Sequence, residues 1–217
     1  MDWESIEDRN RHFNKFYFNE DDNNLVRSLP ALIAFDKWKR QPFYVEVWVE
    51  KEALGNVIEK ACEPWEVPFM ACKGYLSASE AWRAGKRMQA RIDAGQECVI
   101  IHLGDHDPSG IDMTRDNDER TNLFSSYPDE VDIRRIALNQ DQIEQYDPPP
   151  NPTKVTDSRA KDYIKKYGGT SWELDALEPS VMVDLIQDEF KKFLDLDTWD
   201  FVTDEEAEKK KLLTKLS

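Results

Sequence analysis

Two aspartates separated by one residue follow a run of apolar side chains in the segment VIIHLGDHDPSG. The apolar run covers residues 98–103, and Asp105 and Asp107 come directly after Gly104. Side chains at positions i and i+2 of an extended chain point the same way, so both carboxylates are expected to converge on one point. Two carboxylates held close together repel each other unless a cation lies between them. Oxygen ligands without a nearby cysteine favour Mg²⁺ or Mn²⁺ over zinc.

A third carboxylate, Glu50, ends another predicted strand in the segment VEVWVEKEAL. If this strand lies near the strand that precedes Asp105, Glu50 enters the same site. An acidic triad of this kind holds metal against phosphate oxygens. We therefore predict that Glu50, Asp105 and Asp107 are metal ligands and catalytic residues, with Lys51 as a further catalytic residue that meets a phosphate.

Each of these side chains also has a structural explanation. The two aspartates and Ser109 suit the N-cap of the helix that follows them. Glu50 suits the first turn of its own helix, where the helix dipole favours an acid. Lys51 would then simply face solvent. His106 lies between the two aspartates and is expected to point away from both, as a residue at the rim of the site.

The elements that must position these residues alternate along the chain. Apolar patterning predicts strands at 43–49, 67–72, 98–103 and 131–138, and helices at 51–62, 77–95 and 110–127. This alternation predicts an α/β fold: a Rossmann-like central parallel sheet of about four strands with helices on both faces. Ligands gather at the carboxyl ends of the strands in such sheets.

Flanking regions complete the predicted organisation. Residues 1–40 are predicted to be an N-terminal arm, residues 41–200 the α/β domain with its C-terminal helices, and residues 201–217 a charged tail. Two of the C-terminal helices are expected at 158–167 and 179–194.

Composition limits the class of protein. The chain has 217 residues and a formal net charge of −15, which argues against a protein that coats nucleic acid through a general basic surface. Local basic patches remain available at 36–40, at 83–91 and at Lys161, Lys165 and Lys166.

The compartment is also constrained by composition. No apolar run approaches the roughly 20 residues that span a membrane, and the acidic N-terminus is unlike a signal peptide. The three cysteines, Cys62, Cys72 and Cys98, lack metal-binding spacing and are expected to be reduced core thiols. A cytoplasmic protein without membrane contact is predicted.

Taken together, the motifs resemble the Toprim domain, in the version found in the A subunit of type IIB topoisomerases (topoisomerase VI) and in the related meiotic double-strand-break proteins. VWVEKEAL and GDHDPSG carry the resemblance, which continues with Gly74 in CKGYLSASEAWR and with ELDALEP at 173–179. It covers about residues 43–190. The resemblance implies a metal site made by the acidic triad, with Lys51, Gly74 and Gly110 as supports.

The resemblance does not extend to DNA cleavage by tyrosine. Topoisomerase VI-type enzymes use a tyrosine from a winged-helix domain that precedes the Toprim domain, and only about 40 residues precede Phe43 here. Tyr17 has no recognisable surroundings. What the resemblance implies for this chain is therefore the metal site and a Toprim fold.

Three functions are compatible with these residues. The first is a Mg²⁺-dependent phosphodiesterase or nuclease that cleaves or nicks DNA, which it contacts through the metal and a local basic patch. The second is a non-catalytic or partner-dependent Toprim subunit, with a protein partner that supplies a DNA-binding or tyrosine domain, or with a second copy in a homodimer. The third is a phosphatase of the haloacid dehalogenase type, with Asp105 as nucleophile and Asp107 as acid, which leaves Glu50 unexplained.

Overall fold

The structure, a computed structural model, describes residues 30–215 of the chain. These residues belong to two compact units, one formed by residues 36–201 and a smaller one that contains residues 30–35 and 202–215. In the smaller unit the backbone N–H of Phe35 donates to Glu206 Oε2 at 2.8 Å. Most of the predicted arm, including Tyr17, lies outside the described residues.

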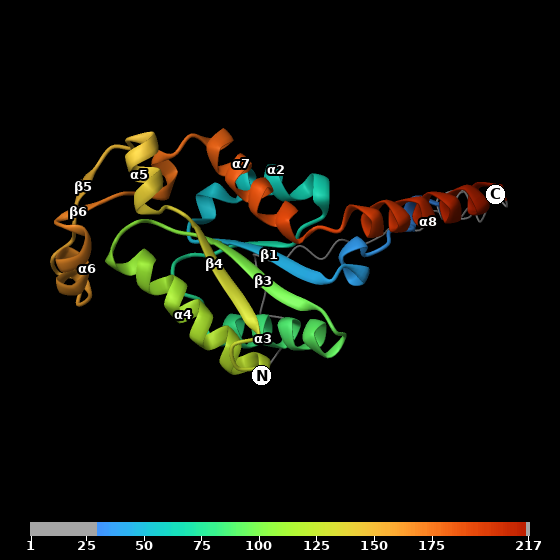
Figure 1. Cartoon of the computed structure of the whole chain (residues 1–217), viewed down its shortest axis with the longest axis horizontal. Coiled ribbons are helices and arrows are strands. Elements are labelled where there is room, and N and C mark those ends of the chain that lie inside the picture. The colour runs from blue at the N-terminus through green and yellow to red at the C-terminus, as the bar shows by residue number, and fades with distance from the viewer. Residues whose placement is uncertain (1–29, 216–217) are drawn as a thin grey trace, which may run out of the picture. The chain divides into compact units, whose positions relative to one another are not determined.

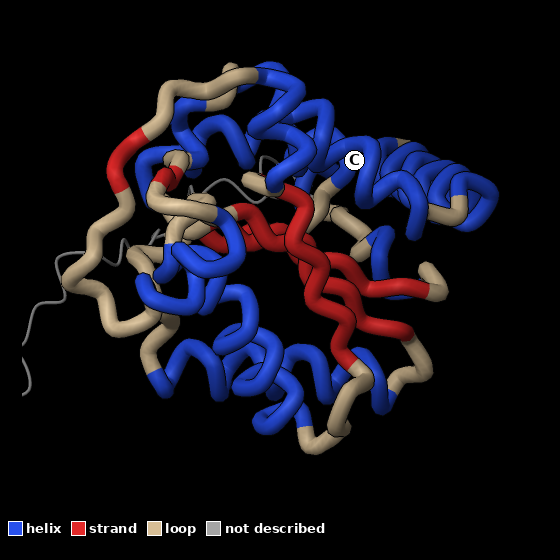
Figure 2. Tube along the Cα trace, turned by 60° about the vertical axis from the view of Figure 1, so that its left-hand side comes forward, coloured by secondary structure: helices blue, strands red, loops and turns tan. Residues whose placement is uncertain are grey.

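A four-stranded parallel sheet forms the centre of the larger unit, as the sequence predicted. Its strands follow the order β2–β1–β3–β4, with bounds β1 (Phe43–Val49), β2 (Phe69–Ala71), β3 (Glu97–Leu103) and β4 (Val131–Ala137). β1 pairs with β3 along its whole length, from Phe43 opposite Glu97 to Val49 opposite Leu103. Figure 2 shows the sheet between two layers of helices.

Helices cover both faces of this sheet. Those of the larger unit are α2 (Gly55–Cys62), α3 (Ala78–Asp93), α4 (Pro108–Ser125), α5 (Gln140–Tyr146), α6 (Ala160–Tyr167) and α7 (Pro179–Phe190), and α8 (Leu196–Thr214) follows. α3 and α4 lie on one face, and α2 and α7 lie on the other (Figure 1). Short 3₁₀ turns complete the chain at Lys37–Arg40, Glu52–Leu54, Glu63–Trp65, Leu174–Ala176 and Lys191–Phe193.

Burial on both sides explains why the two central strands are apolar. Val45, Val47, Ile100 and Ile101 are each fully buried, and removing apolar surface from water stabilises the fold by roughly 25 cal/mol per Å². α3 and α4 pack closely against each other because Gly85 has no side chain: a Cβ there would lie 2.5 Å from Phe124 Cβ. The cysteines of the chain are free and buried, as predicted.

Local signals define most element ends. The Ser77 hydroxyl accepts a hydrogen bond from the N–H of Glu80 at 3.2 Å and so caps α3. After this helix, Gly95 takes a φ of +87°, which glycine adopts without steric cost. β2 is shorter than the predicted strand at 67–72: its register with β1 runs from Phe69 to Ala71, and beyond it the N–H of Cys72 donates to the Val49 carbonyl at 2.7 Å.

Between β4 and α7 the chain forms a segment that lies beyond the carboxyl ends of the strands (Figure 1). It contains α5, α6 and two short antiparallel strands, β5 (Asn151–Pro152) and β6 (Thr170–Ser171). The predicted helix at 158–167 corresponds to α6. No helix within residues 30–215 is long and apolar enough to cross a membrane.

Candidate functional site

Glu50 and the two aspartates meet at the carboxyl ends of β1 and β3. The backbone N–H of Glu50 donates to the carbonyl of Leu103 at 2.9 Å, which extends the pairing of the two strands by one residue. The side chain then crosses to the loop at residues 104–107, hereafter the aspartate loop, where Glu50 Oε2 accepts the backbone N–H of Asp105 at 2.9 Å. Direct pairing of β1 with β3 therefore brings Glu50 to the aspartates.

Two glycines make room for this crossing. A Cβ on Gly104 would lie 2.9 Å from Glu50 Oε2. A Cβ on Gly110 would lie 2.2 Å from the carbonyl oxygen of Asp105 and 3.0 Å from Glu50 Oε2. Side chains at either position would push the carboxylate away from the loop. Gly74, in the loop after β2, supports the same place, since its N–H donates to the Glu50 carbonyl at 3.3 Å.

The two aspartates use one oxygen each in hydrogen bonds. Asp105 Oδ1 accepts the backbone N–H of Leu174 at 2.7 Å. Asp107 is the N-cap of α4, where its Oδ1 accepts the N–H of Gly110 at 2.7 Å and the hydroxyl of Ser109 at 2.9 Å. The structural explanation is therefore correct for one oxygen of Asp107. It is wrong for Ser109, because Asp107 is the N-cap of α4. It is also wrong for Glu50, which precedes Lys51, the N-cap of the 3₁₀ turn Glu52–Leu54, and so lies outside the first turn.

Each of the three carboxylates keeps a second oxygen. Within the described part of the chain, Glu50 Oε1, Asp105 Oδ2 and Asp107 Oδ2 accept no hydrogen bond. Such oxygens are the hard ligands that Mg²⁺ and Mn²⁺ prefer. Among residues 30–215 no group of three or more His, Cys, Asp or Glu side chains is already arranged to hold a metal ion. Cation binding would thus require these carboxylates to rotate.

Burial and like charge act on the acids of this site. Burial, reinforced by the negative charge of Asp105, raises the pKa of Glu50 to about 7. Burial also raises the pKa of Asp105, against the hydrogen bond from Leu174. Glu50 therefore changes its protonation near neutral pH in the metal-free protein.

Arg135 on β4 fastens the aspartate loop, a role that sequence reasoning missed. Its guanidinium donates to the carbonyls of Gly104 at 2.8 Å, Asp105 at 2.7 Å and Gly110 at 3.0 Å. Burial lowers the pKa of Arg135 to about 10, so it stays charged at neutral pH. The available signal was an arginine in the middle of the apolar strand VDIRRIAL.

Lys51 lies within a second group of acids. Its Nζ is 2.6 Å from Glu173 Oε2, 2.9 Å from Asp175 Oδ1 and 3.3 Å from Asp105 Oδ1. Although burial opposes it, hydrogen bonding to Glu173 and Asp175 raises the pKa of Lys51. Lys51 thus connects the ELDALEP segment to the acidic site. Lys51 stays protonated, and its positive charge neutralises part of the negative charge of the site.

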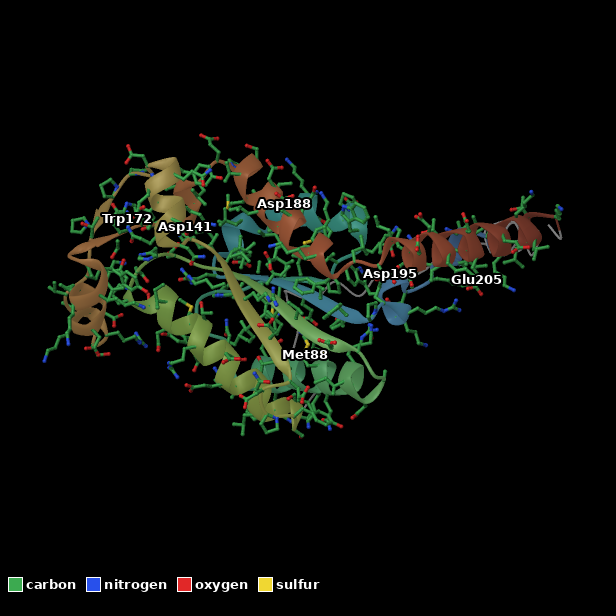
Figure 3. All side chains as sticks on the ribbon, in the orientation of Figure 1. Met88, Asp141, Trp172, Asp188, Asp195 and Glu205 are labelled. Atoms are coloured by element: carbon green, nitrogen blue, oxygen red, sulfur yellow. The ribbon has the colours of Figure 1, made fainter. Side chains whose placement is uncertain are left out.

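His106 points away from the aspartates, but its predicted place at the rim is wrong because its side chain is buried. Its Nδ1 lies 2.7 Å from the Tyr163 hydroxyl, and its ring packs against Tyr167 and Trp172. Figure 3 shows Trp172 in the segment beside α6. Sequence reasoning missed this aromatic cluster, although the segment YIKKYGGTSW signals it.

Comparison of the chain with protein-family models, with curated proteins and with solved structures finds no match. The function is therefore inferred from the arrangement of these side chains.

Proposed function

We propose that this chain is a metal-dependent DNA-processing protein of the Toprim type, a phosphodiesterase that cleaves or nicks DNA with Mg²⁺ or Mn²⁺. One observation carries the proposal: Glu50, Asp105 and Asp107 meet at the carboxyl ends of two central strands, and each has one carboxylate oxygen that accepts no hydrogen bond from residues 30–215. Acids that served only the fold would be expected to use both oxygens.

The acidic residues and Lys51 would have different roles in this reaction. Asp105 and Asp107 would hold the cation, and a bound divalent cation stabilises charge on phosphate oxygens and acidifies bound water. Glu50 would complete the ligand set or transfer a proton, because a pKa of about 7 suits proton transfer at neutral pH. Lys51 is protonated and cannot act as a base; it would orient Asp105 and contribute positive charge beside the phosphate.

A plasmid assay tests the proposal. The purified protein is incubated with supercoiled plasmid and Mg²⁺ or Mn²⁺, and nicked product is measured with and without EDTA. We expect nicking that EDTA abolishes and that Asp105→Asn lowers by at least about a hundredfold, as expected for loss of a metal ligand. Asp188→Asn, an exposed position on α7, removes the same charge elsewhere and should nick normally. Nicking that persists in Asp105→Asn would disprove the assignment.

The second candidate is a partner-dependent Toprim subunit. Large apolar side chains favour it: Trp82 on α3 is 51% exposed and Leu123 on α4 is 69% exposed. Such a subunit would bind metal but would not nick plasmid alone. Metal-dependent nicking by the purified monomer, measured across the peak of a size-exclusion column, would exclude it.

A further inference from the structure

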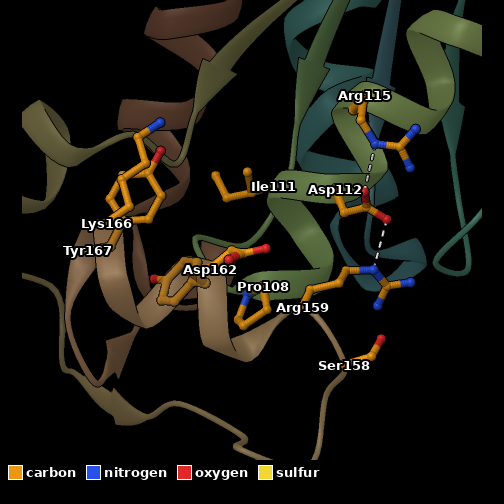
Figure 4. A pocket seen from close by; sticks show the side chains of 10 residues that line it. Pro108, Ile111, Asp112, Arg115, Ser158, Arg159, Asp162, Lys166 and Tyr167 are labelled. Carbon is orange, nitrogen blue, oxygen red and sulfur yellow. Dashed lines mark hydrogen bonds and ion pairs between the residues drawn. The ribbon is translucent and has the colours of Figure 1, made fainter.

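A pocket of about 390 Å³ lies between α4 and α6, next to the aspartate loop (Figure 4). α4 contributes Pro108 and Ile111 to its wall, and α6 contributes Tyr163 and Tyr167. Because Pro108 directly follows Asp107, the pocket begins where the acidic site ends. Its volume falls within the range of about 300–1,000 Å³ that is usual for ligand sites.

Three basic side chains line this pocket together with two acids, Asp112 and Asp162, and carboxylates pair with both arginines. Arg115, Arg159 and Lys166 line it, with Lys166 on one side and the two arginines on the other in Figure 4. Between residues 154 and 167 the chain has five basic and two acidic residues, although its net charge is −15. Lys166 lies over the Tyr167 ring at 4.8 Å and forms no ion pair with a carboxylate in the described part of the chain.

Asp112 fixes the two arginines. Its Oδ1 accepts the Nε–H of Arg115 at 2.8 Å, and its Oδ2 lies 2.8 Å from Arg159 Nε and accepts the Tyr75 hydroxyl at 2.7 Å. Each guanidinium keeps its Nη2 without a partner among residues 30–215. The arginines are thus oriented and retain donors for an anionic ligand.

The pocket and the acidic site are rigidly connected through His106. The Tyr163 hydroxyl on α6 donates to the His106 carbonyl at 2.8 Å. His106 and Trp172 also exchange two backbone hydrogen bonds, of 2.8 and 3.0 Å. A ligand held in the pocket would therefore keep a fixed position relative to Asp105 and Asp107.

We propose that the pocket binds one unpaired nucleotide of a nucleic-acid strand whose next phosphodiester lies at the acidic site. The cations would hold the phosphates. Lys166 would move from the Tyr167 ring to a phosphate, and the ring face that it leaves would stack on the base, since such stacking accepts any base. A base inside a duplex cannot enter a pocket without leaving the stack. The inference rests on the proposed function and names its substrate: a single strand, or a frayed end, in preference to intact duplex.

Binding measured without metal tests this inference separately from cleavage. A fluorescein-labelled single-stranded oligonucleotide is titrated with protein in EDTA at low salt, and fluorescence anisotropy is recorded. We expect Lys166→Glu to weaken binding by about tenfold, as expected for a lost phosphate contact, and Lys166→Arg to retain it. Lys161→Glu is the matched control, because Lys161 is exposed on the same helix but does not line the pocket. It should bind nearly as wild type.

Three outcomes would overturn the pocket assignment. These are equal weakening by Lys161→Glu, duplex binding as tight as single-strand binding, and equally tight binding of a free nucleoside monophosphate. Asp105→Asn separates the two proposals, because it should bind the oligonucleotide without nicking plasmid. If the wild-type protein nicks plasmid but its oligonucleotide binding does not change in Lys166→Glu, the pocket proposal is rejected and the phosphodiesterase proposal stands. Binding that depends on Lys166 without any nicking would reject the phosphodiesterase alone.

Discussion

Glu46 lies in the middle of β1 and Glu50 directly follows its last residue, and the two carboxylates have opposite surroundings. Glu46 is buried in the middle of the strand and accepts hydrogen bonds on both oxygens: from Arg87 at 2.9 and 3.0 Å, from Tyr44 at 2.9 Å and from Trp48 at 2.8 Å. Glu50 accepts one backbone N–H, and its nearest charged neighbours include Asp105 and Asp107.

The difference separates a carboxylate that maintains the fold from one that is available to a ligand. Glu46 has a cationic partner and two neutral donors, so its charge is compensated inside the protein. Glu50 lies at the end of the strand with one oxygen uncommitted and with a raised pKa. Removing a partner of Glu46 should therefore destabilise the protein, whereas removing the charge of Glu50 should stabilise it.

The largest effect is expected from Arg87→Met. Glu46 would keep its charge in a buried position without its cation. Because Arg87 itself is 43% exposed, the pair is only partly buried, and the loss of its hydrogen bonds to the carboxylate should cost about 3 kcal/mol. Urea denaturation should show this loss, together with a lower melting temperature. Arg83→Met, on the exposed face of the same helix α3, should change the free energy of unfolding by less than about 0.5 kcal/mol. If the two substitutions lowered the free energy of unfolding equally, the ion pair between Glu46 and Arg87 would have no special role in maintaining the fold.

Divalent metal should stabilise the Glu50 end of the strand. At a Mn²⁺ concentration about 100 times its dissociation constant, the free energy of unfolding should rise by about 2.7 kcal/mol. Thermal melting of wild type and of Asp188→Asn should show this increase, and Asp105→Asn should not. A melting temperature that is independent of Mn²⁺ in wild type would contradict the predicted metal site.

A smaller effect of opposite sign is expected for Glu50→Gln in EDTA. The folded pKa of Glu50, about 7, lies above the ordinary value of 4.5. The stability that this group contributes is therefore complete below about pH 4.5 and is lost as the pH rises through 7. Glutamine does not titrate, so the variant should match wild type at pH 4. At pH 8 it should exceed the stability of wild type by at most about 3.4 kcal/mol, and solvent screening around the partly exposed Glu50 lowers this gain to about 2 kcal/mol.

Chemical denaturation at the two pH values measures this difference. Glu46→Gln is the matched control, and it should be less stable than wild type at both pH values because it leaves Arg87 without its carboxylate. A Glu50→Gln variant that is less stable than wild type at pH 8 would show that Glu50, like Glu46, maintains the fold.

The smallest effect is expected for Lys51→Met. Lys51 contacts three acids, but Glu173 and Asp175 have about half of their side-chain surface exposed, and such ion pairs contribute about 1 kcal/mol or less. Denaturation in EDTA should show a loss of that size. A loss above about 3 kcal/mol would indicate that Lys51 belongs with the structural pair of Glu46 and not with the site.

Much of the fold was predictable because it depends on local patterns. The continuous apolar run before Asp105 predicts a central strand buried on both sides, and Ser77 predicts the start of α3. The meeting of Glu50 with the aspartates needed one further assumption, that the first and third strands are neighbours. The structure confirms this pairing.

The remaining contacts of the site could not be read from sequence because they depend on side-chain reach across the fold. Arg135 binds the carbonyls of Gly104 and Asp105 in the aspartate loop and the carbonyl of Gly110 in the first turn of α4, all of them 25 or more residues earlier in the chain. The same limit applies to Lys51, which reaches acids more than 120 residues away. Spacing in the sequence carries no signal for either contact, since both arise when separate elements converge at the ends of the strands.

Because Asp105, His106 and Asp107 alternate in direction, the aspartate loop makes different contacts on its two sides. One side presents acids, and the other anchors α6 through the His106 backbone and ring. Grafting a foreign segment in place of residues 140–171 would therefore disturb the acids as well, unless the graft supplied its own hydroxyl and aromatic partners for this histidine. Any redesign of this end of the molecule has to treat the loop and the α6 segment as a single transferable part.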